Sequence, residues 1–251
     1  MRKKVLAFDL DGTLAITKSP LSDKMGEIMT RLLDKYDVCV ISGGGYDQFI
    51  IQVVNRLESS PIQLRRLHLM PTCGTRYYRY NENNRDWELQ YAEDLTLKEK
   101  KEIIKTLEES AKELGLWEEK TAGDIIEDRL SQITFSALGQ QATAEDKHAW
   151  DPDGSKKKTL RDAVAAKLPA LEVRVGGTTS IDITRANIDK AYGMRKLIDT
   201  LDISREEILF FGDQLQEGGN DYPVKAMGID SIQVDGWEDT ARCLEAILYV
   251  S

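Results

Sequence analysis

Short apolar runs and helix-like repeats alternate along the first third of the chain. Residues Val5–Phe8 are continuous and apolar, which is typical of a strand buried on both faces. Residues 22–36 place apolar side chains three and four positions apart, as in an amphipathic helix. Further strands are expected over 37–41, 67–71 and 76–80, and a helix over 46–57. This order predicts an α/β fold with a Rossmann-like parallel-sheet core.

The pattern changes between about residues 83 and 184. Alternating apolar and polar residues predict strands over 87–91, 132–136, 171–175 and 180–184, with helices over 96–114 and 156–168. The last third returns to α/β order, with helices over 190–201 and 238–248 and strands over 208–211 and 229–234. We therefore expect a core domain formed by residues 1–82 and 185–251, and an inserted α+β domain at 83–184.

Polar residues follow several of these strands at the point where each leaves the sheet. Asp9 and Asp11 follow the first strand, Ser42 follows the second, and Asp213 and Asp221 follow the strand at 208–211. Open α/β sheets bind ligands at this edge. Carboxylate oxygens suit Mg²⁺, and a carboxylate can also act as a nucleophile or a proton carrier. The alternative is structural, because aspartate and serine are common in turns and helix caps.

Composition and charge narrow the classes of function. With 41% hydrophobic and 31% charged residues, the 251-residue chain has the composition of a globular protein. Its net charge of −9 argues against broad nucleic-acid binding. Three widely spaced cysteines suggest a reducing compartment, and no apolar run is long enough for a signal peptide or a membrane span. We expect a cytoplasmic protein without a membrane partner, and the sequence is compatible with a homodimer.

Four short motifs, in this order, resemble the haloacid dehalogenase superfamily of phosphotransferases. They are Asp9-Leu10-Asp11-Gly12-Thr13, Ser42 after an apolar strand, Lys190, and Gly212-Asp213 with Gly218-Gly219-Asn220-Asp221. An insertion between the Ser42 and Lys190 motifs corresponds to a type IIB, or C2, cap. Without this resemblance, Asp189-Lys190 at a helix start would more often be a solvated pair.

The resemblance implies a role for each matching residue. Asp9 would be the nucleophile that forms an aspartyl phosphate, and Asp11 would be the general acid and base. Ser42 would hold the phosphoryl oxygens and Lys190 would neutralise them. Mg²⁺ would be bound by the four acids, and substrate would also be contacted by residues beside these motifs. The implied metal ligands are Asp9, Asp11, Asp213 and Asp221, and the core residues expected to bind substrate are Gly43 and Asn220.

Within the superfamily, the whole chain resembles the eukaryotic-type phosphomannomutases. The likeness includes Ile126-Glu127-Asp128-Arg129, Gly176-Gly177 with Ser180-Ile181-Asp182, and Glu238-Asp239-Thr240. It implies that Arg129, Ser180 and Asp182 bind the distal phosphate of a sugar. Gln140 departs from the pattern, because a second cap arginine is expected soon after Gly139. A mutase must grip both ends of a bisphosphate, so this departure favours hydrolysis.

These observations lead to three hypotheses for function. The first is a Mg²⁺-dependent phosphatase that hydrolyses a small phosphorylated metabolite, a sugar phosphate, through an aspartyl phosphate. The second is a phosphomannomutase or phosphoglucomutase that interconverts hexose 1- and 6-phosphates. The third is a sugar-phosphate sensor that has kept the fold without catalysis, against which the complete set of acids argues.

Overall fold

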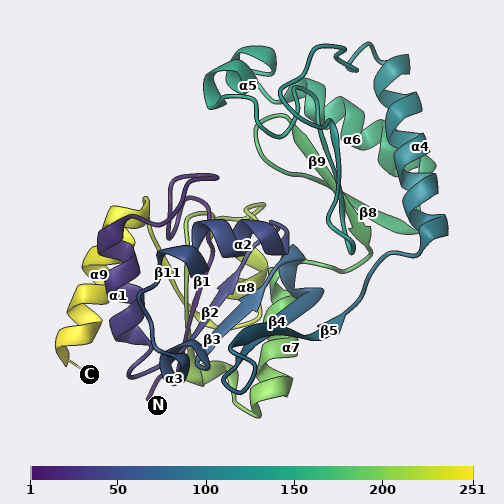
Figure 1. Cartoon of the computed structure of the whole chain (residues 1–251). Coiled ribbons are helices and arrows are strands. Elements are labelled where there is room, and N and C mark those ends of the chain that lie inside the picture. Colours follow the sequence, from purple (N-terminus) through teal and green to yellow (C-terminus); the bar gives the residue numbers. More distant parts are fainter. Residues whose placement is uncertain (1, 251) are drawn as a thin grey trace. The chain divides into compact units, whose positions relative to one another are not determined.

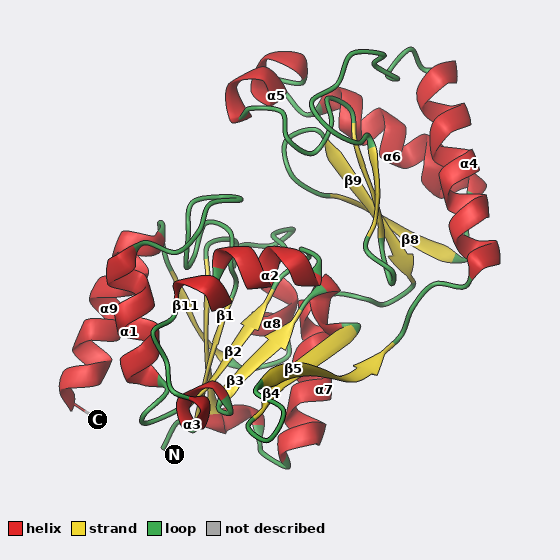
Figure 2. Cartoon of the chain, viewed as in Figure 1, coloured by secondary structure: helices red, strands yellow, loops and turns green. Residues whose placement is uncertain are grey.

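The computed structural model describes residues 2–250, which form two compact units (Figures 1 and 2). The core unit contains the residues up to Ala92 and those from Asp189 onward, and the inserted unit contains Glu93–Ile188. Met1 and Ser251, the ends of the expected core domain, lie outside the described residues. Within residues 2–250, no helix combines the length and the apolar character needed to cross a bilayer.

The core unit is built on a seven-stranded sheet with the order β11-β10-β1-β2-β3-β4-β5. Every neighbouring pair from β11 to β3 is parallel, whereas β4 and β5 extend the sheet as antiparallel strands. The strands are β1 (Val5–Phe8), β2 (Asp37–Ile41), β3 (Leu67–Met70), β4 (Arg76–Asn81), β5 (Asp86–Ala92), β10 (Ile208–Gly212) and β11 (Asp230–Gln233).

Helices cover both faces of this sheet. Successive side chains of a strand point to opposite faces, so Leu6 and Phe8 of β1 pack in one apolar cluster with α1 and α9, while Val5 and Ala7 pack in a second cluster with α7 and α8. The helices are α1 (Asp23–Leu32), α2 (Tyr46–Gln52), α3 (Pro61–Leu64), α7 (Lys190–Leu201), α8 (Tyr222–Ala226) and α9 (Trp237–Val250), with 3₁₀ turns η1 (Val54–Arg56), η2 (Thr72–Gly74) and η3 (Arg205–Glu207).

The inserted unit is a four-stranded antiparallel sheet, ordered β6-β7-β9-β8, packed against helices. Its apolar face carries Ile181 and Ile183 of β9, which share a cluster with Ile103 and Leu160 from the helices. Its elements are α4 (Leu97–Glu113), β6 (Ile126–Asp128), β7 (Ile133–Ser136), α5 (Ala144–Trp150), α6 (Ser155–Lys167), β8 (Leu171–Val175) and β9 (Ser180–Arg185).

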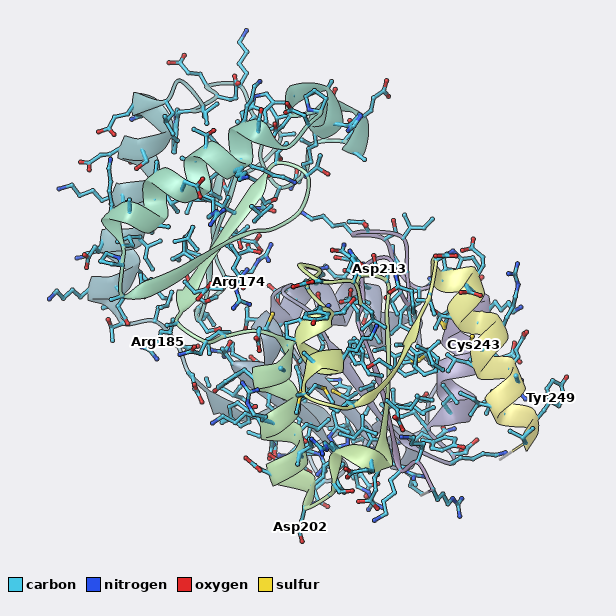
Figure 3. All side chains as sticks on the ribbon, turned by 180° about the vertical axis from the view of Figure 1, so that it is seen from behind. Arg174, Arg185, Asp202, Asp213, Cys243 and Tyr249 are labelled. Atoms are coloured by element: carbon cyan, nitrogen blue, oxygen red, sulfur yellow. The ribbon has the colours of Figure 1, made fainter. Side chains whose placement is uncertain are left out.

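A charged contact joins the end of β9 to the start of α4. Glu99 forms a capping box with Thr96, and Arg185, which is labelled in Figure 3, donates to both carboxylate oxygens of Glu99. These hydrogen bonds lower the pKa of Glu99 to about 2. The contact joins the first helix of the inserted unit to its last strand, near the residues where the chain enters and leaves the unit.

The expected α/β fold with an inserted α+β domain is confirmed, and several details differ. The stretch 87–91 is a strand as expected, but β5 pairs with β4 in the core sheet, so the inserted unit runs from Glu93 to Ile188 rather than over 83–184. The helix expected over 46–57 ends at Gln52 and is followed by η1. The pattern did not reveal β6 or α5, which are three and seven residues long.

Candidate active site

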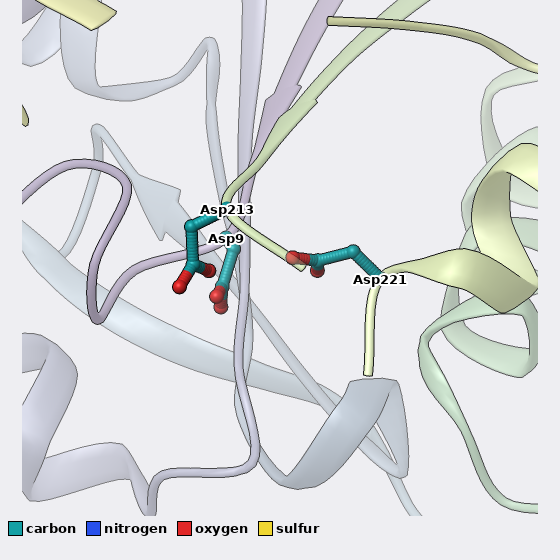
Figure 4. Close-up of side chains that lie close together, drawn as sticks. All are labelled: Asp9, Asp213 and Asp221. Atoms are coloured by element: carbon teal, nitrogen blue, oxygen red, sulfur yellow. The ribbon is translucent and has the colours of Figure 1, made fainter. Parts of the chain in front are cut away.

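Three carboxylates meet at the carboxyl edge of the parallel strands. Asp9 directly follows β1 and Asp213 follows β10, and these two strands are paired so that Phe8 lies beside Phe211. Asp221 precedes the first residue of α8. One oxygen of each carboxylate lies within 4.8 Å of the others, and Figure 4 shows the three side chains directed toward one another. The structure therefore brings together three of the four predicted metal ligands.

Lys190 supplies positive charge to this group. Asp189 caps α7 by accepting from the backbone N–H of Tyr192 at 2.8 Å, which makes Lys190 the first residue of the helix. Its Nζ lies 2.6 Å from Oδ1 of Asp9 and 2.6 Å from Oδ1 of Asp221, and all three side chains are buried. The lysine therefore bridges the two carboxylates.

Burial and mutual charge shift the pKa of these groups. Burial raises the pKa of Asp9 to about 7, with Lys190 opposing the shift and Asp221 adding to it. Burial alone would lower the pKa of Lys190, but Asp9 and Asp221 outweigh it and raise that pKa above its ordinary value. The pKa of Asp213 is raised by burial and by Asp221. Lys190 therefore stays charged, and an added cation would favour the ionised carboxylates.

The donor set fits a divalent cation. When all three carboxylates are ionised, they exceed the charge of the Lys190 ammonium by two negative charges. Among the described residues, Oδ1 of Asp213 is a buried oxygen without a hydrogen-bond partner. Such an atom costs free energy unless a ligand satisfies it, and carboxylate oxygens suit Mg²⁺. Asp9, Asp213 and Asp221 are the residues that would hold the ion.

Two glycines make room for these carboxylates. Gly12 has a φ of +85°, and a Cβ there would lie 2.7 Å from Oδ2 of Asp213. A Cβ on Gly212 would lie 2.5 Å from Oδ2 of Asp221. A larger residue at either position would displace a carboxylate. This steric constraint explains why glycine follows Asp11 and precedes Asp213.

The carboxylate of Asp11 is not one of the three that converge. Its Oδ1 accepts from the backbone N–H of Lys18 at 2.8 Å and from Gln52 Nε2 at 3.2 Å, and its Oδ2 accepts from Gln48 Nε2 at 3.0 Å. Although Asp11 is only two residues from Asp9, its carboxylate has a separate set of hydrogen-bond partners. Its assignment as a metal ligand stays a prediction.

Ser42 and Gly43 lie in the loop that follows β2. Ser42 is buried, and its Oγ accepts from the backbone N–H of Gly44 at 3.2 Å. The backbone N–H groups of Thr72 and Cys73 donate to the carbonyls of Gly44 and Ser42, each at 2.9 Å. Thr72 and Cys73 adopt φ values of 50° and 56°, a costly conformation that residues with a Cβ seldom adopt. This strained turn therefore fixes the Ser42 loop. The other predicted substrate residue of the core unit, Asn220, is exposed and directly precedes Asp221.

The predicted substrate residues of the inserted unit lie on its sheet and the adjoining loop. Ser180 and Asp182 alternate with the buried Ile181 and Ile183, so they share the opposite face of β9. Asp182 accepts from Thr134 Oγ1 at 2.7 Å. Burial raises its pKa, and the nearby charge of Arg129 opposes that shift. Arg129 also donates to Glu127 at 2.7 Å. Their role in phosphate binding stays a prediction.

Sequence reasoning missed the two glutamines that contact Asp11. Gln48 and Gln52 are four residues apart, so they lie on the same side of α2. The only indication in the sequence was the spacing of these two amides on the helix that follows the Ser42 loop. The pattern of apolar residues does not show which polar group they contact.

A family model described as haloacid dehalogenase-like hydrolase matches residues 6–223. The chain is 27% identical over 262 residues to a phosphomannomutase of Encephalitozoon cuniculi, covering 98% of this chain and 94% of that protein. It is 26% identical over 231 residues to a phosphomannomutase of Triticum aestivum, covering 86% and 84% of the two chains.

Solved structures share the fold at lower sequence identity. An IMP-nucleotidase of Plasmodium falciparum superposes with a TM-score of 0.70 at 17% identity, covering 100% of this chain and 70% of that one. A haloacid dehalogenase-like hydrolase from Bacteroides thetaiotaomicron superposes with a TM-score of 0.64 at 17% identity, covering 98% and 100% of the two chains. The second likeness spans both units of the present structure.

Proposed function

Because the chain belongs to the haloacid dehalogenase-like hydrolases and resembles the phosphomannomutases within them, it is an enzyme that acts on phosphate groups, and we propose that it is a Mg²⁺-dependent phosphatase. Its substrate would be a small phosphorylated metabolite of the sugar phosphate class. The observation that carries the proposal is the buried group of Asp9, Lys190 and Asp221, with Asp213 beside it.

The three cysteines remain thiols, which supports a reducing compartment such as the cytoplasm.

In the first half-reaction, an oxygen of Asp9 attacks the phosphorus atom and the bond from phosphorus to the leaving oxygen breaks. Asp11 gives its proton to that oxygen. In the second half-reaction, water attacks the aspartyl phosphate, its proton passes to Asp11, and phosphate leaves Asp9. When bound, Mg²⁺ would neutralise charge on the phosphoryl oxygens.

The other residues hold the phosphoryl group. Lys190 keeps its positive charge beside Asp9, so it neutralises charge that develops on the phosphoryl oxygens. The Ser42 hydroxyl and the backbone of Gly43 donate to the same oxygens, and Asn220 contacts the substrate from the loop before Asp221. Arg129, Ser180 and Asp182 would contact its distal part.

Replacement of the nucleophile is the direct test. Asp9→Asn keeps the shape of the side chain but replaces the carboxylate with a poor nucleophile, so phosphate release should fall to background. The assay measures phosphate from a panel of sugar phosphates with and without MgCl₂. Asp202→Asn, at an exposed position after α7, is the matched control and should retain wild-type turnover. Unchanged turnover in Asp9→Asn would refute the mechanism, and an inactive wild type would leave the sensor hypothesis.

A second candidate is favoured by the phosphomannomutase relatives, which match across nearly the whole chain. It is the interconversion of hexose 1- and 6-phosphates. Mannose 1-phosphate and a hexose bisphosphate primer are incubated with the protein, and both the 6-phosphate and free phosphate are measured. Formation of the 6-phosphate without free phosphate would support the mutase over the phosphatase.

A further inference from the structure

The carboxylate of Asp11 is held by three donors, of which two come from one face of α2. Gln48 Nε2 donates to Oδ2 at 3.0 Å, and Gln52 Nε2 donates to Oδ1 at 3.2 Å. The third donor is the backbone N–H of Lys18, which reaches Oδ1 at 2.8 Å. Hydrogen bonds to both oxygens fix the position and the rotation of a carboxylate group.

The orientation of the Gln52 amide is fixed by its neighbours. Its Nε2 also donates to the carbonyl of Ser19 at 2.6 Å, so both of its partners are acceptors. A flipped amide would place Oε1 against two acceptor oxygens and lose both hydrogen bonds. Gln52 is 2% exposed, so water could not readily replace these contacts. The amide therefore presents one N–H to Asp11 and the other to Ser19.

The side chain of Gln48 fits beside Gly44 because that residue has no side chain. A Cβ on Gly44 would lie 2.3 Å from Oε1 of Gln48, so the amide occupies the space that Gly44 leaves. Gly44 also bonds to the Ser42 hydroxyl and to the Thr72 amide. The position of Gln48 is thus tied to the loop that carries Ser42.

We propose that Gln48 and Gln52 are positioning residues that select Oδ2 of Asp11 as the atom that carries the proton. A carboxylate oxygen has two lone-pair positions. Within residues 2–250, Oδ1 accepts two hydrogen bonds and is filled, whereas Oδ2 accepts one and keeps one lone-pair position. The inference rests on the proposed function, in which Asp11 serves as general acid and base.

This assignment states where the proton goes in each half-reaction. In the first, the proton on Oδ2 passes to the leaving oxygen as the bond between that oxygen and phosphorus breaks. In the second, the attacking water gives a proton back to Oδ2 as the bond from Asp9 to phosphorus breaks. Without Gln48, the carboxylate can rotate, and proton transfer loses its aligned geometry.

The test compares two substitutions at one position. Gln48→Met keeps the length of the side chain and removes the donor, whereas Gln48→His has a similar reach and retains an N–H donor. Release of alcohol in the first turnover is measured with 4-nitrophenyl phosphate, whose leaving group needs little protonation, and with glycerol 1-phosphate, whose leaving alkoxide needs a proton.

In Gln48→Met, the first-turnover rate should fall about 10–100-fold for the alkyl ester and by no more than about threefold for the aryl ester. Because the second half-reaction also needs Oδ2, the aryl ester should give a burst of nitrophenolate near one equivalent of enzyme, followed by slow turnover. Gln48→His should restore much of the alkyl rate. Ile51→Gln, which is exposed on the same helix, is the control and should match the wild type.

Equal slowing of both esters in Gln48→Met, or no slowing of either, would overturn the inference. Gln48→Ala repeats the comparison if methionine is not accommodated above Gly44. Thermal unfolding of each variant separates a positioning effect from a loss of fold. If the wild type shows no turnover that depends on Asp9, the proposed function fails. If the wild-type turnover does depend on Asp9 and the two esters still respond alike in Gln48→Met, only the role of the glutamines fails.

Discussion

At the residue scale, the buried charges of the core unit depend on Lys190. Its ammonium contacts two buried carboxylates at 2.6 Å each, and neither Asp9 nor Asp221 is more than 4% exposed. Charges removed from water are tolerated only when they are paired or bind an ion. Among the described residues, Oδ1 of the neighbouring Asp213 has no hydrogen-bond partner, and a cation is one ligand that would satisfy it.

Lys190→Met should therefore impair both stability and catalysis. Removing one partner of a buried ion pair costs about 3–5 kcal/mol in free energy of unfolding, and the loss of a group that stabilises charge costs about 100–1,000-fold in turnover. MgCl₂ should raise the melting temperature of the variant more than that of the wild type, because three carboxylates then lack a counter-charge.

Thermal unfolding with and without MgCl₂ and phosphate release measure these effects. Lys225→Met, which removes an exposed lysine from α8, controls for the loss of a positive charge. Wild-type turnover in Lys190→Met would contradict the role assigned to the ammonium.

The residues of the acidic group were predictable because each one follows a recognisable strand or begins a helix. Asp9 and Asp213 converge because parallel strands end at one edge, and a strand can be identified from its own residues; Asp221 joins them from the start of α8. Gln48 and Gln52 were not predictable, because a polar residue on a helix gives no sign of its partner. The conformation of Thr72 was equally hidden, since tertiary contacts impose it.

At the element scale, β1 shows why the type of an element was easier to predict than its partners. Its apolar run indicates burial on both faces, and both faces are covered. The alternation in β5 predicts a strand but does not identify the neighbouring strand, and pairing with β4 places it in the core sheet. β6 is too short for any periodic pattern.

The strand β3 carries a buried histidine that makes the folded protein less stable as the pH falls. His68 is fully buried, and its Nδ1 lies 2.7 Å from the hydroxyl of Tyr77 on β4. Burial lowers its pKa below the ordinary value of 6.5, with Asp37 partly opposing the shift. Below about pH 6.5 the unfolded chain therefore takes up a proton that the folded chain does not. His68 thus contributes stability that is lost as the pH falls.

Urea unfolding at pH 7.5 and pH 5.5 tests this effect. For one proton, the loss of stability approaches at most about 1.4 kcal/mol per unit of pH. His68→Gln should lose less stability than the wild type between the two values, although it is less stable at both. The raised pKa of Asp9 acts in the opposite direction in this range, but it is common to both proteins and cancels in the comparison.

His148→Gln is the matched control, because His148 is exposed and is the other histidine of the chain. It should show the same change of stability with pH as the wild type. Equal changes in the wild type and His68→Gln would rule out His68 as the source.

At the scale of the whole molecule, each of the two units has its own apolar core. The core unit buries two clusters, one on each face of its sheet, and the inserted unit buries a separate cluster around Phe135 and Ile181. Composition predicted a globular chain, and the change of pattern predicted an insertion. The exact junctions at Ala92 and Asp189 depend on strand pairing and on side chains such as Arg185, which local patterns do not reveal.

The inserted unit should fold when it is separated from the rest of the chain. A fragment of residues 93–188 retains the four-stranded sheet, α4, α6, and the contact between Arg185 and Glu99. It also retains two of the four tryptophans, Trp117 and Trp150, both packed against its apolar cluster. Near-ultraviolet circular dichroism should therefore show ordered aromatic side chains, and the signal should disappear in one cooperative thermal transition.

Leu160→Asp in the same fragment provides the control, because it places a charge in the buried cluster and should abolish the near-ultraviolet signal. A parent fragment that already lacks the signal, or that unfolds without a cooperative transition, would show that its core is insufficient alone. A folded fragment would mean that the inserted unit supplies the elements around Arg129, Ser180 and Asp182 independently of the catalytic core. Its sheet would then be free to bind a phosphate ester in isolation, and titration of the fragment with sugar phosphates would measure that affinity without turnover.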